Sequence, residues 1–138
     1  MVLSAPTRVL ALWAGNVSER TQGMATTFST DEVHPRDRLS YWREVATRGF
    51  ARHRFHAGNG NEYQGSVTLG ALADLGVASY ECDPGEIERA AEHISSSDND
   101  DLLICAQFDG QGTAAQDGRH EKVLKENICL LDPRALPE

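Results

Sequence analysis

Histidines and a neighbouring carboxylate are the residue types in this chain that could bind a catalytic metal ion. A metal-dependent enzyme built on a β-barrel takes a His-x-His pair, a carboxylate a few residues later and a further histidine, converging from adjacent strands. The candidates here are His53, His56, His93 and His120, the last followed by Glu121. On a strand, His53 and His56 would point to opposite faces because they are three residues apart. We therefore predict no metal site, and we interpret His120 and Glu121 as the solvated start of a strand.

Serine and glycine patterns for other catalytic chemistry are also weak. A Ser–His–Asp hydrolase needs its nucleophile on a sharp turn of the G-x-S-x-G type. Ser66 has no such context, and Ser95–Ser97 lies in a polar stretch typical of a loop. The stretch Gly58–Asn61 has no Lys, Ser or Thr to hold a phosphate, so it predicts a turn. The chain is therefore predicted not to be an enzyme, and no cofactor is expected.

The three cysteines, Cys82, Cys105 and Cys129, are widely spaced and form no C-x-x-C pair for zinc binding or redox chemistry. Cys105 and Cys129 lie within apolar runs that are typical of strands. We interpret them as buried cysteines that act as small hydrophobic side chains. Reduced cysteines fit a cytoplasmic protein, because the cytosol keeps thiols reduced.

The composition is that of one globular domain with an acidic surface. The 138 residues suffice for one core, and an apolar fraction of 40% with a mean hydropathy of -0.44 argues against a membrane protein. The formal net charge of -8 argues against direct contact with nucleic acid, which needs a basic surface. The apolar run Val9–Ala14 is too short to span a bilayer, so no membrane partner is expected.

One amphipathic helix followed by short strands is expected to position the side chains. Pro35 fits the first turn of a helix that extends to about Arg48, with Trp42 on its apolar face as a core residue. Short runs with strand character follow at residues 50–56, 62–69, 72–80 and 102–108. The run at 102–108 is continuous enough to predict a central strand that is buried on both faces. Asp117–Gly118 predicts a hairpin turn, and the order of elements favours a barrel or sandwich.

The N-terminal segment is expected to lie outside the domain. Residues 1–27 read as a disordered leader or a start-site extension, since the short apolar stretch Val9–Ala14 and the polar residues after it make a poor secretory signal. We expect translation to begin at Met24, just ahead of the pattern that starts at Phe28. The domain is therefore predicted to span residues 28–138.

Short motifs follow one another along the chain in a recognisable order. They are Phe28-Ser-Thr-Asp-Glu-Val, Pro35-Arg-Asp-Arg-Leu-Ser-Tyr-Trp42, Gln107-Phe-Asp-Gly110, Gln116-Asp-Gly-Arg119 and Leu130-Leu-Asp132. Together they resemble the N-terminal ligand-binding domain of AraC/XylS-type transcriptional regulators. The resemblance implies a mainly β fold with a leading helix (α+β), arranged as a cupin-like jelly-roll barrel that binds a small-molecule effector and supports dimerisation. In the family, a C-terminal pair of helix-turn-helix units binds DNA.

The chain departs from the family near its C-terminus. It ends at Glu138, so the DNA-binding half and the closing strands of the barrel are expected to be missing. Where the family has a Pro-Gly-Asp turn, this chain has Lys125-Glu126-Asn127. We therefore expect a truncated regulator with an incomplete barrel. It would pair with itself as a homodimer or with a full-length relative, and would not contact DNA directly.

Arg89 and Gln107 are the candidate ligand-binding residues. Gln107 lies inside an otherwise apolar strand, where a buried amide needs hydrogen-bond partners. A ligand could supply those partners, and so could a neighbouring strand. Two further hypotheses stay open: a metal-free cupin-fold module for interaction or dimerisation without a ligand, and an enzyme on a cupin barrel.

Overall fold

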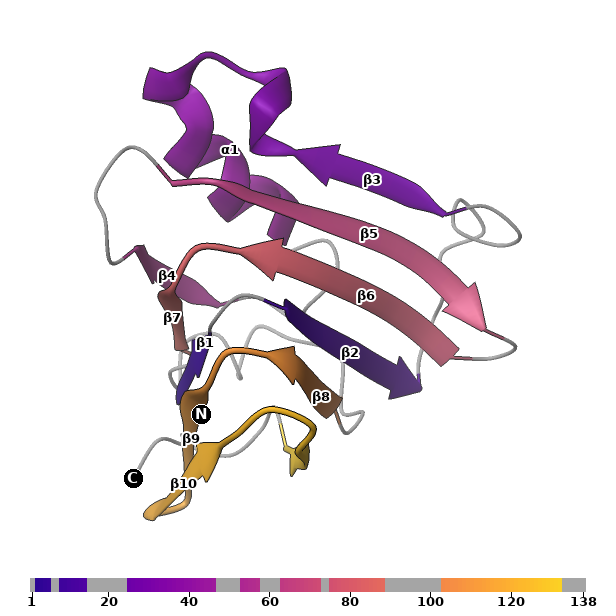
Figure 1. Cartoon of the computed structure of the whole chain (residues 1–138), viewed down its shortest axis with the longest axis vertical. Helices are drawn as coiled ribbons and strands as arrows, with labels where there is room; N and C mark the ends of the chain where they lie inside the picture. The colour runs from indigo at the N-terminus through magenta and orange to yellow at the C-terminus, as the bar shows by residue number, and fades with distance from the viewer. Residues whose placement is uncertain are drawn as a thin grey trace.

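The computed structural model describes residues 2–5, 8–14, 25–46, 53–57, 63–72, 75–88 and 103–132. Within them the strands form two antiparallel sheets (Figure 1). The five-stranded sheet has the order β10-β9-β1-β7-β4, from β1 (Val2–Ala5), β4 (Arg54–Ala57), β7 (Gly85–Glu88), β9 (Gly112–Gln116) and β10 (Arg119–Val123). The six-stranded sheet has the order β11-β8-β2-β6-β5-β3, from β2 (Arg8–Ala14), β3 (Thr26–Ser29), β5 (Gly65–Leu72), β6 (Leu75–Cys82), β8 (Leu103–Asp109) and β11 (Ile128–Leu131). The expected mainly β fold with one α-helix is confirmed, although the described strands do not close into a barrel.

The N-terminal segment contributes a central strand to each sheet, which corrects the expected leader over residues 1–27 in its described part. β1 lies between β7 and β9, and β2 lies between β6 and β8. Val9 and Ala11 are buried, while Arg8 on the opposite face of β2 is exposed. The alternation of β2 is therefore that of a strand with one face in the core. Thr26 and Thr27 also belong to a strand, because β3 pairs with β5.

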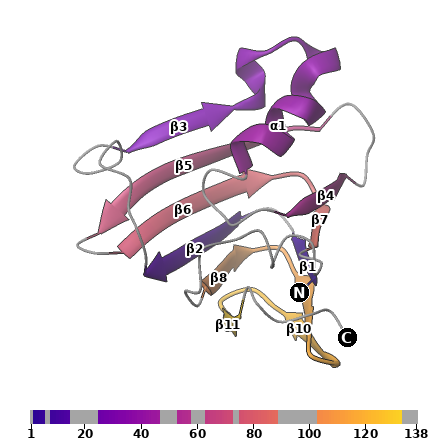
Figure 2. The same cartoon turned by 180° about the vertical axis from the view of Figure 1, so that it is seen from behind.

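One α-helix packs against strands of both sheets. The 3₁₀ turns η2 (Thr30–Glu32) and η3 (Pro35–Asp37) lead into α1 (Arg38–Ala46). Pro35 takes the first position of η3, where its missing N–H costs nothing, and Nδ1 of His34 accepts a hydrogen bond from the Arg36 N–H. The helix contacts both β4 and β5, which are strands of different sheets. Figure 2 shows α1 lying against the face of β5.

The core lies between the sheets and under α1. Trp42 is 2% exposed, so its predicted place in the core is confirmed. It faces the space between the sheets. Along β8, Leu103 and Cys105 are buried, but Ile104 and Phe108 are 40% and 52% exposed. The prediction that this strand is buried on both faces is therefore wrong: one face of the six-stranded sheet is open.

The hairpin predicted at Asp117–Gly118 is confirmed. It joins β9 to β10, with Gln116 opposite Arg119, and both turn residues have positive φ, at 51° and 75°. This is the geometry of a type I′ turn, which matches the twist of the flanking strands and favours Asp-Gly. A second tight turn leads into β11, and there Glu126 has φ 71°. This left-handed backbone suits glycine better than a residue with a Cβ such as Glu126.

Replacing Glu126 with glycine should stabilise the protein. The left-handed conformation costs a residue with a Cβ roughly 1–2 kcal/mol, and the greater flexibility of glycine in the unfolded chain returns part of that. We expect Glu126→Gly to raise the free energy of unfolding by about 1 kcal/mol in urea denaturation. Gly118→Ala is the matched control at φ 75°, with open space around the added methyl group, and should lower that free energy by about 1 kcal/mol. Shifts of the same sign in both variants would contradict this account.

Candidate ligand-binding site

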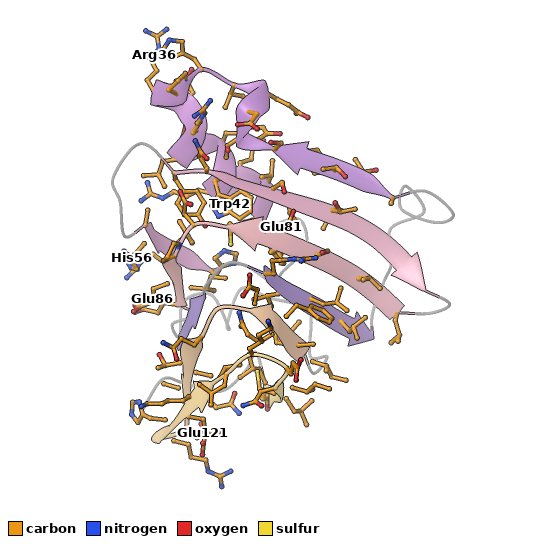
Figure 3. All side chains as sticks on the ribbon, in the orientation of Figure 1. Arg36, Trp42, His56, Glu81, Glu86 and Glu121 are labelled. Atoms are coloured by element: carbon orange, nitrogen blue, oxygen red, sulfur yellow. The ribbon has the colours of Figure 1, made fainter. Side chains whose placement is uncertain are left out.

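A small apolar cavity lies between the sheets, closed on one side by α1. Its volume is about 30 Å³, which is room for roughly one water-sized group. Both sheets and the helix supply its lining: Val9, Ala11, Trp42, Ala46, Phe55, Tyr63, Tyr80, Cys82, Ile87 and Cys105. Figure 3 shows the Trp42 side chain beside α1, behind the ribbons of β5 and β6. Because its lining comes from five strands, the helix and Tyr63, the cavity depends on the tertiary fold and not on any local motif.

Aromatic rings form one wall of this cavity. The ring of Trp42 lies 5.4 Å from that of Tyr63 and 6.2 Å from that of Tyr80, measured between centroids. Phe55 meets Tyr63 edge to face at 5.1 Å. Such tilted and edge-on contacts are favourable for aromatic pairs beyond the area they bury. The wall is therefore well packed in the absence of a ligand.

The two tyrosine hydroxyls are held by the backbone. Tyr63 donates to the carbonyl of Asp83 at 2.7 Å, and Tyr80 donates to the carbonyl of Ala46 at 3.4 Å. Burial raises the pKa of both Tyr63 and Tyr80 well above the usual range, so both phenols stay neutral. With their hydroxyls engaged, the tyrosines present mainly ring carbon to the cavity. The chemistry that this cavity favours is apolar contact.

An open polar groove runs across the end of the six-stranded sheet. Its volume is about 430 Å³, within the range of small-molecule sites. It is lined by Arg8, Ser29, Thr30, Asp31, Gln64, Gly65, Ser66, Glu81, Cys82, Asp83 and Asp109. Among these described residues four are carboxylates and one is a cation, so the groove is acidic. The cation, Arg8, pairs with Glu81 at 3.3 Å through largely exposed side chains, so this ion pair is screened by solvent.

Backbone amides fix part of the groove wall. Asp83 accepts a hydrogen bond from the Gln64 N–H at 3.0 Å, and Thr30 accepts one from the Gly65 N–H at 3.1 Å. These contacts tie the start of β5 to the end of β6 and to η2. The groove is therefore preformed by the pairing of strands and turns, while Asp31 and Glu81 stay exposed at its rim.

Cys82 joins the two spaces, because it lines both the groove and the cavity. Burial raises the pKa of the Cys82 thiol above its usual value. The junction is therefore a neutral thiol at neutral pH. A ligand with one polar end and one apolar end would have the polar end in the groove and the apolar end directed past Cys82.

Of the two ligand-binding residues predicted from the sequence, the structure describes Gln107 alone. Gln107 is 4% exposed in β8, and its amide nitrogen donates to the backbone carbonyls of Asp109 and Arg8. Neighbouring backbone thus supplies the partners that a buried amide needs, and Gln107 is not among the residues that line the cavity or the groove. Arg89 lies outside the described residues. Ligand binding by Arg89 and Gln107 stays a prediction.

Sequence analysis missed most of the lining residues. Tyr80 and Cys82 occupy the inward-facing positions of β6 together with Ala78, and that alternation was the available signal. Tyr63 lies just before β5, where no periodicity marks it as buried, although it is 0% exposed. The residues considered for metal chemistry lie elsewhere: His120 and Glu121 are exposed on β10. Within the described ranges, no three His, Cys, Asp or Glu side chains are grouped so that they could hold a metal ion.

Comparison with known protein families agrees with the mainly β fold. The family model described as AraC-binding-like domain matches residues 42–135. The chain is 26% identical over 109 residues to "Uncharacterized protein in nit 5'region" from Bacillus sp. (strain OxB-1), an alignment that covers 79% of this chain and 42% of that relative. The chain thus spans less than half the length of this relative. No solved structure matches, and no helix among the described residues is long and apolar enough to cross a membrane. Because the family match covers well over half of its length, this chain belongs to the AraC-binding-like domain family, whose domain is cupin-like.

Proposed function

We propose that the chain is an effector-sensing domain of a transcriptional regulator and that it works in the cytoplasm. Its effector would be a small molecule with an apolar, aromatic-sized part and a cationic group such as an ammonium. The observation that carries this proposal is that the acidic groove and the aromatic cavity are neighbours that share Cys82 in their walls. The carboxylates of the groove attract a cation, and the rings of Trp42 and Tyr63 offer an apolar group a surface.

The size of the two spaces sets the binding mode. The groove is large enough for a small ligand as it stands, whereas the cavity of about 30 Å³ is not. Entry of an apolar group therefore requires Trp42 or α1 to move. A ligand that binds the displaced arrangement better would shift the protein towards it, and this shift is how occupancy would be transmitted.

Transcriptional output requires a DNA-binding partner. The net charge of -8 does not favour contact between this chain and DNA, so DNA binding is assigned to other parts of the assembly. Pairing with a full-length relative would bring such parts to the sensor. The greater length of the Bacillus relative is consistent with this division of labour.

A thermal-shift screen tests the ligand class. Arylalkylamines should raise the Tm of the protein, and matched aryl carboxylates should not. At a hundredfold excess over Kd the stabilisation is about 2.7 kcal/mol, equivalent to roughly 10 °C for a domain of this size. The variant Asp31→Asn/Glu81→Gln, which removes two exposed rim carboxylates, should weaken binding of the amines about tenfold.

A control variant makes the same change in charge on the five-stranded sheet. Glu121→Gln/Asp117→Asn alters two exposed acids at the β9–β10 hairpin, and it should bind amines like the unaltered protein. Equal losses of affinity for amines in both variants would mean that the effect is a general attraction between charges. A screen without any hit, together with concentration-dependent self-association in sedimentation, would favour the alternative of a dimerisation module. The exposed apolar side chains of Ile128 and Leu130 on β11 would then be its natural contact.

A further inference from the structure

Two cysteines face each other across neighbouring strands. β8 and β11 are antiparallel, and their register sets Cys105 directly opposite Cys129. Side chains at directly opposite positions of an antiparallel pair point to the same face, with Cα atoms about 4.5–5.5 Å apart. A disulfide needs Cα atoms about 4.4–6.8 Å apart, so strand pairing alone brings these residues within bonding range. The sequence spacing gave no sign of this, because the two residues belong to separate strands.

The two thiols differ in their access to solvent. Cys105 is 4% exposed and lines the apolar cavity, whereas Cys129 is half-buried on β11 at the edge of the sheet. The neighbouring thiol of Cys105 lowers the pKa of Cys129, while the neighbouring Cys129 and burial raise the pKa of Cys105. Cys129 is thus the more exposed and the more easily ionised of the pair, which are the properties of an attacking thiol.

We propose that Cys105 and Cys129 are a redox-sensitive pair that a hydroperoxide converts to a disulfide between β8 and β11. The thiolate sulfur of Cys129 attacks the O–O bond of hydrogen peroxide, an S–O bond forms, and hydroxide leaves and takes up a proton as water. The sulfur of Cys105 then attacks the sulfenic acid, the S–S bond forms, and the S–O bond breaks with loss of a second water. Two thiols and one peroxide thus give one disulfide and two waters, and a dithiol reductant restores the pair.

This site is separate from ligand binding but touches the same cavity. The disulfide would draw the Cys105 sulfur towards β11 and away from its present place in the cavity wall. It would also fasten an edge strand whose backbone is paired on one side in the described structure. The proposal does not depend on the effector hypothesis, because it needs only the register of two strands.

Peptide mapping of the oxidised full chain tests the pair. After treatment of the folded protein with hydrogen peroxide, thiol titration under denaturing conditions should fall from three thiols to one. Cleavage after Arg54, Arg89, Arg119 and Lys125 places the three cysteines in three different tryptic peptides. The non-reduced digest should contain the Cys105 and Cys129 peptides as one linked species, lighter than their sum by two hydrogens, and reduction should separate them. A link to Cys82, a link between two chains, or Cys129 oxidised without any link would overturn the proposal.

Two variants separate the roles of the sulfurs. Cys82→Ser removes the third thiol and should leave the oxidation-dependent link unchanged. Cys105→Ala removes the resolving sulfur, so Cys129 should remain as a sulfenic acid that a 1,3-dicarbonyl reagent traps. If Cys105→Ala fails to fold, the mapping of the unaltered protein and of Cys82→Ser still decides the outcome. A sulfenic acid trapped on Cys82 and not on Cys129 would contradict the assignment.

Discussion

A chain that begins at Met24 should not fold. It would lack β1 and β2, and each of these strands has a hydrogen-bonded neighbour on both sides. Their loss divides both sheets and exposes the backbone of β6, β7, β8 and β9, together with the core surface that Val9 and Ala11 cover. A domain is stable by only about 5–15 kcal/mol, which the loss of two central strands exceeds. We expect no cooperative transition in thermal or urea unfolding monitored by circular dichroism.

A control for this test keeps the N-terminal segment and substitutes one residue on each face of β2. Val9→Asp places a charge among buried side chains and should lower the free energy of unfolding by more than about 3 kcal/mol. Leu10→Thr, on the opposite and partly exposed face of the same strand, should cost about 1 kcal/mol or less. If the chain from Met24 melted cooperatively near the Tm of the longer chain, the N-terminal strands would be dispensable and the expected leader would be right after all.

The sequence was informative where structure is local. The 3₁₀ turn that begins at Pro35 and leads into α1 depends on a residue with fixed φ, and the Asp117–Gly118 turn depends on positive φ at both positions, so both could be predicted from a few neighbouring residues. Trp42 could be placed in the core because helical periodicity identified one apolar face. Each of these predictions needed a window no longer than one turn or one helix.

The N-terminal strands could not be recognised in this way. β2 pairs with β6 and β8, which lie far along the chain, and a short apolar run carries no mark of such partners. The polar stretch after Ala14 favoured an isolated segment, and the family pattern that began at Phe28 strengthened that interpretation. A strand gains its stability from cross-strand contacts, so its identity is decided by tertiary structure.

The candidate site was harder to predict for the same reason. Gln107 was chosen because an amide in an apolar strand needs partners, and the backbone carbonyls of Arg8 and Asp109 supply them. The partner at Arg8 belongs to β2, where the register with β8 shifts between Arg8 and Val9. With the N-terminal strand taken as a leader, this carbonyl could not be considered. The prediction that Gln107 binds a ligand therefore does not take this partner into account, and it stays a prediction.

Trp42→Ala should be the most destabilising single truncation in the core, and indole should partly reverse it. Trp42 is 2% exposed and packs against Tyr63 and Tyr80, so its removal should cost about 3–5 kcal/mol. The space left behind would extend the existing apolar cavity, and a dry apolar cavity binds aromatic molecules of matching size. Millimolar indole should therefore raise the Tm of this variant by several degrees and leave that of the unaltered protein within about one degree.

Two further variants establish that the effect belongs to this position. Phe108→Ala truncates an aromatic residue that is 52% exposed, and it should cost less than about 1 kcal/mol and show no response to indole. A methyl group at Gly65 would lie 2.9 Å from Cζ3 of Trp42, so Gly65→Ala should destabilise the unaltered protein. Without the indole ring that clash is relieved, and the same change should cost less by about 1 kcal/mol or more in the Trp42→Ala background. Additive costs, or equal responses to indole with and without Trp42, would mean that the ring does not fill the space between the sheets, and the cavity would then lose its place in the proposed sensor.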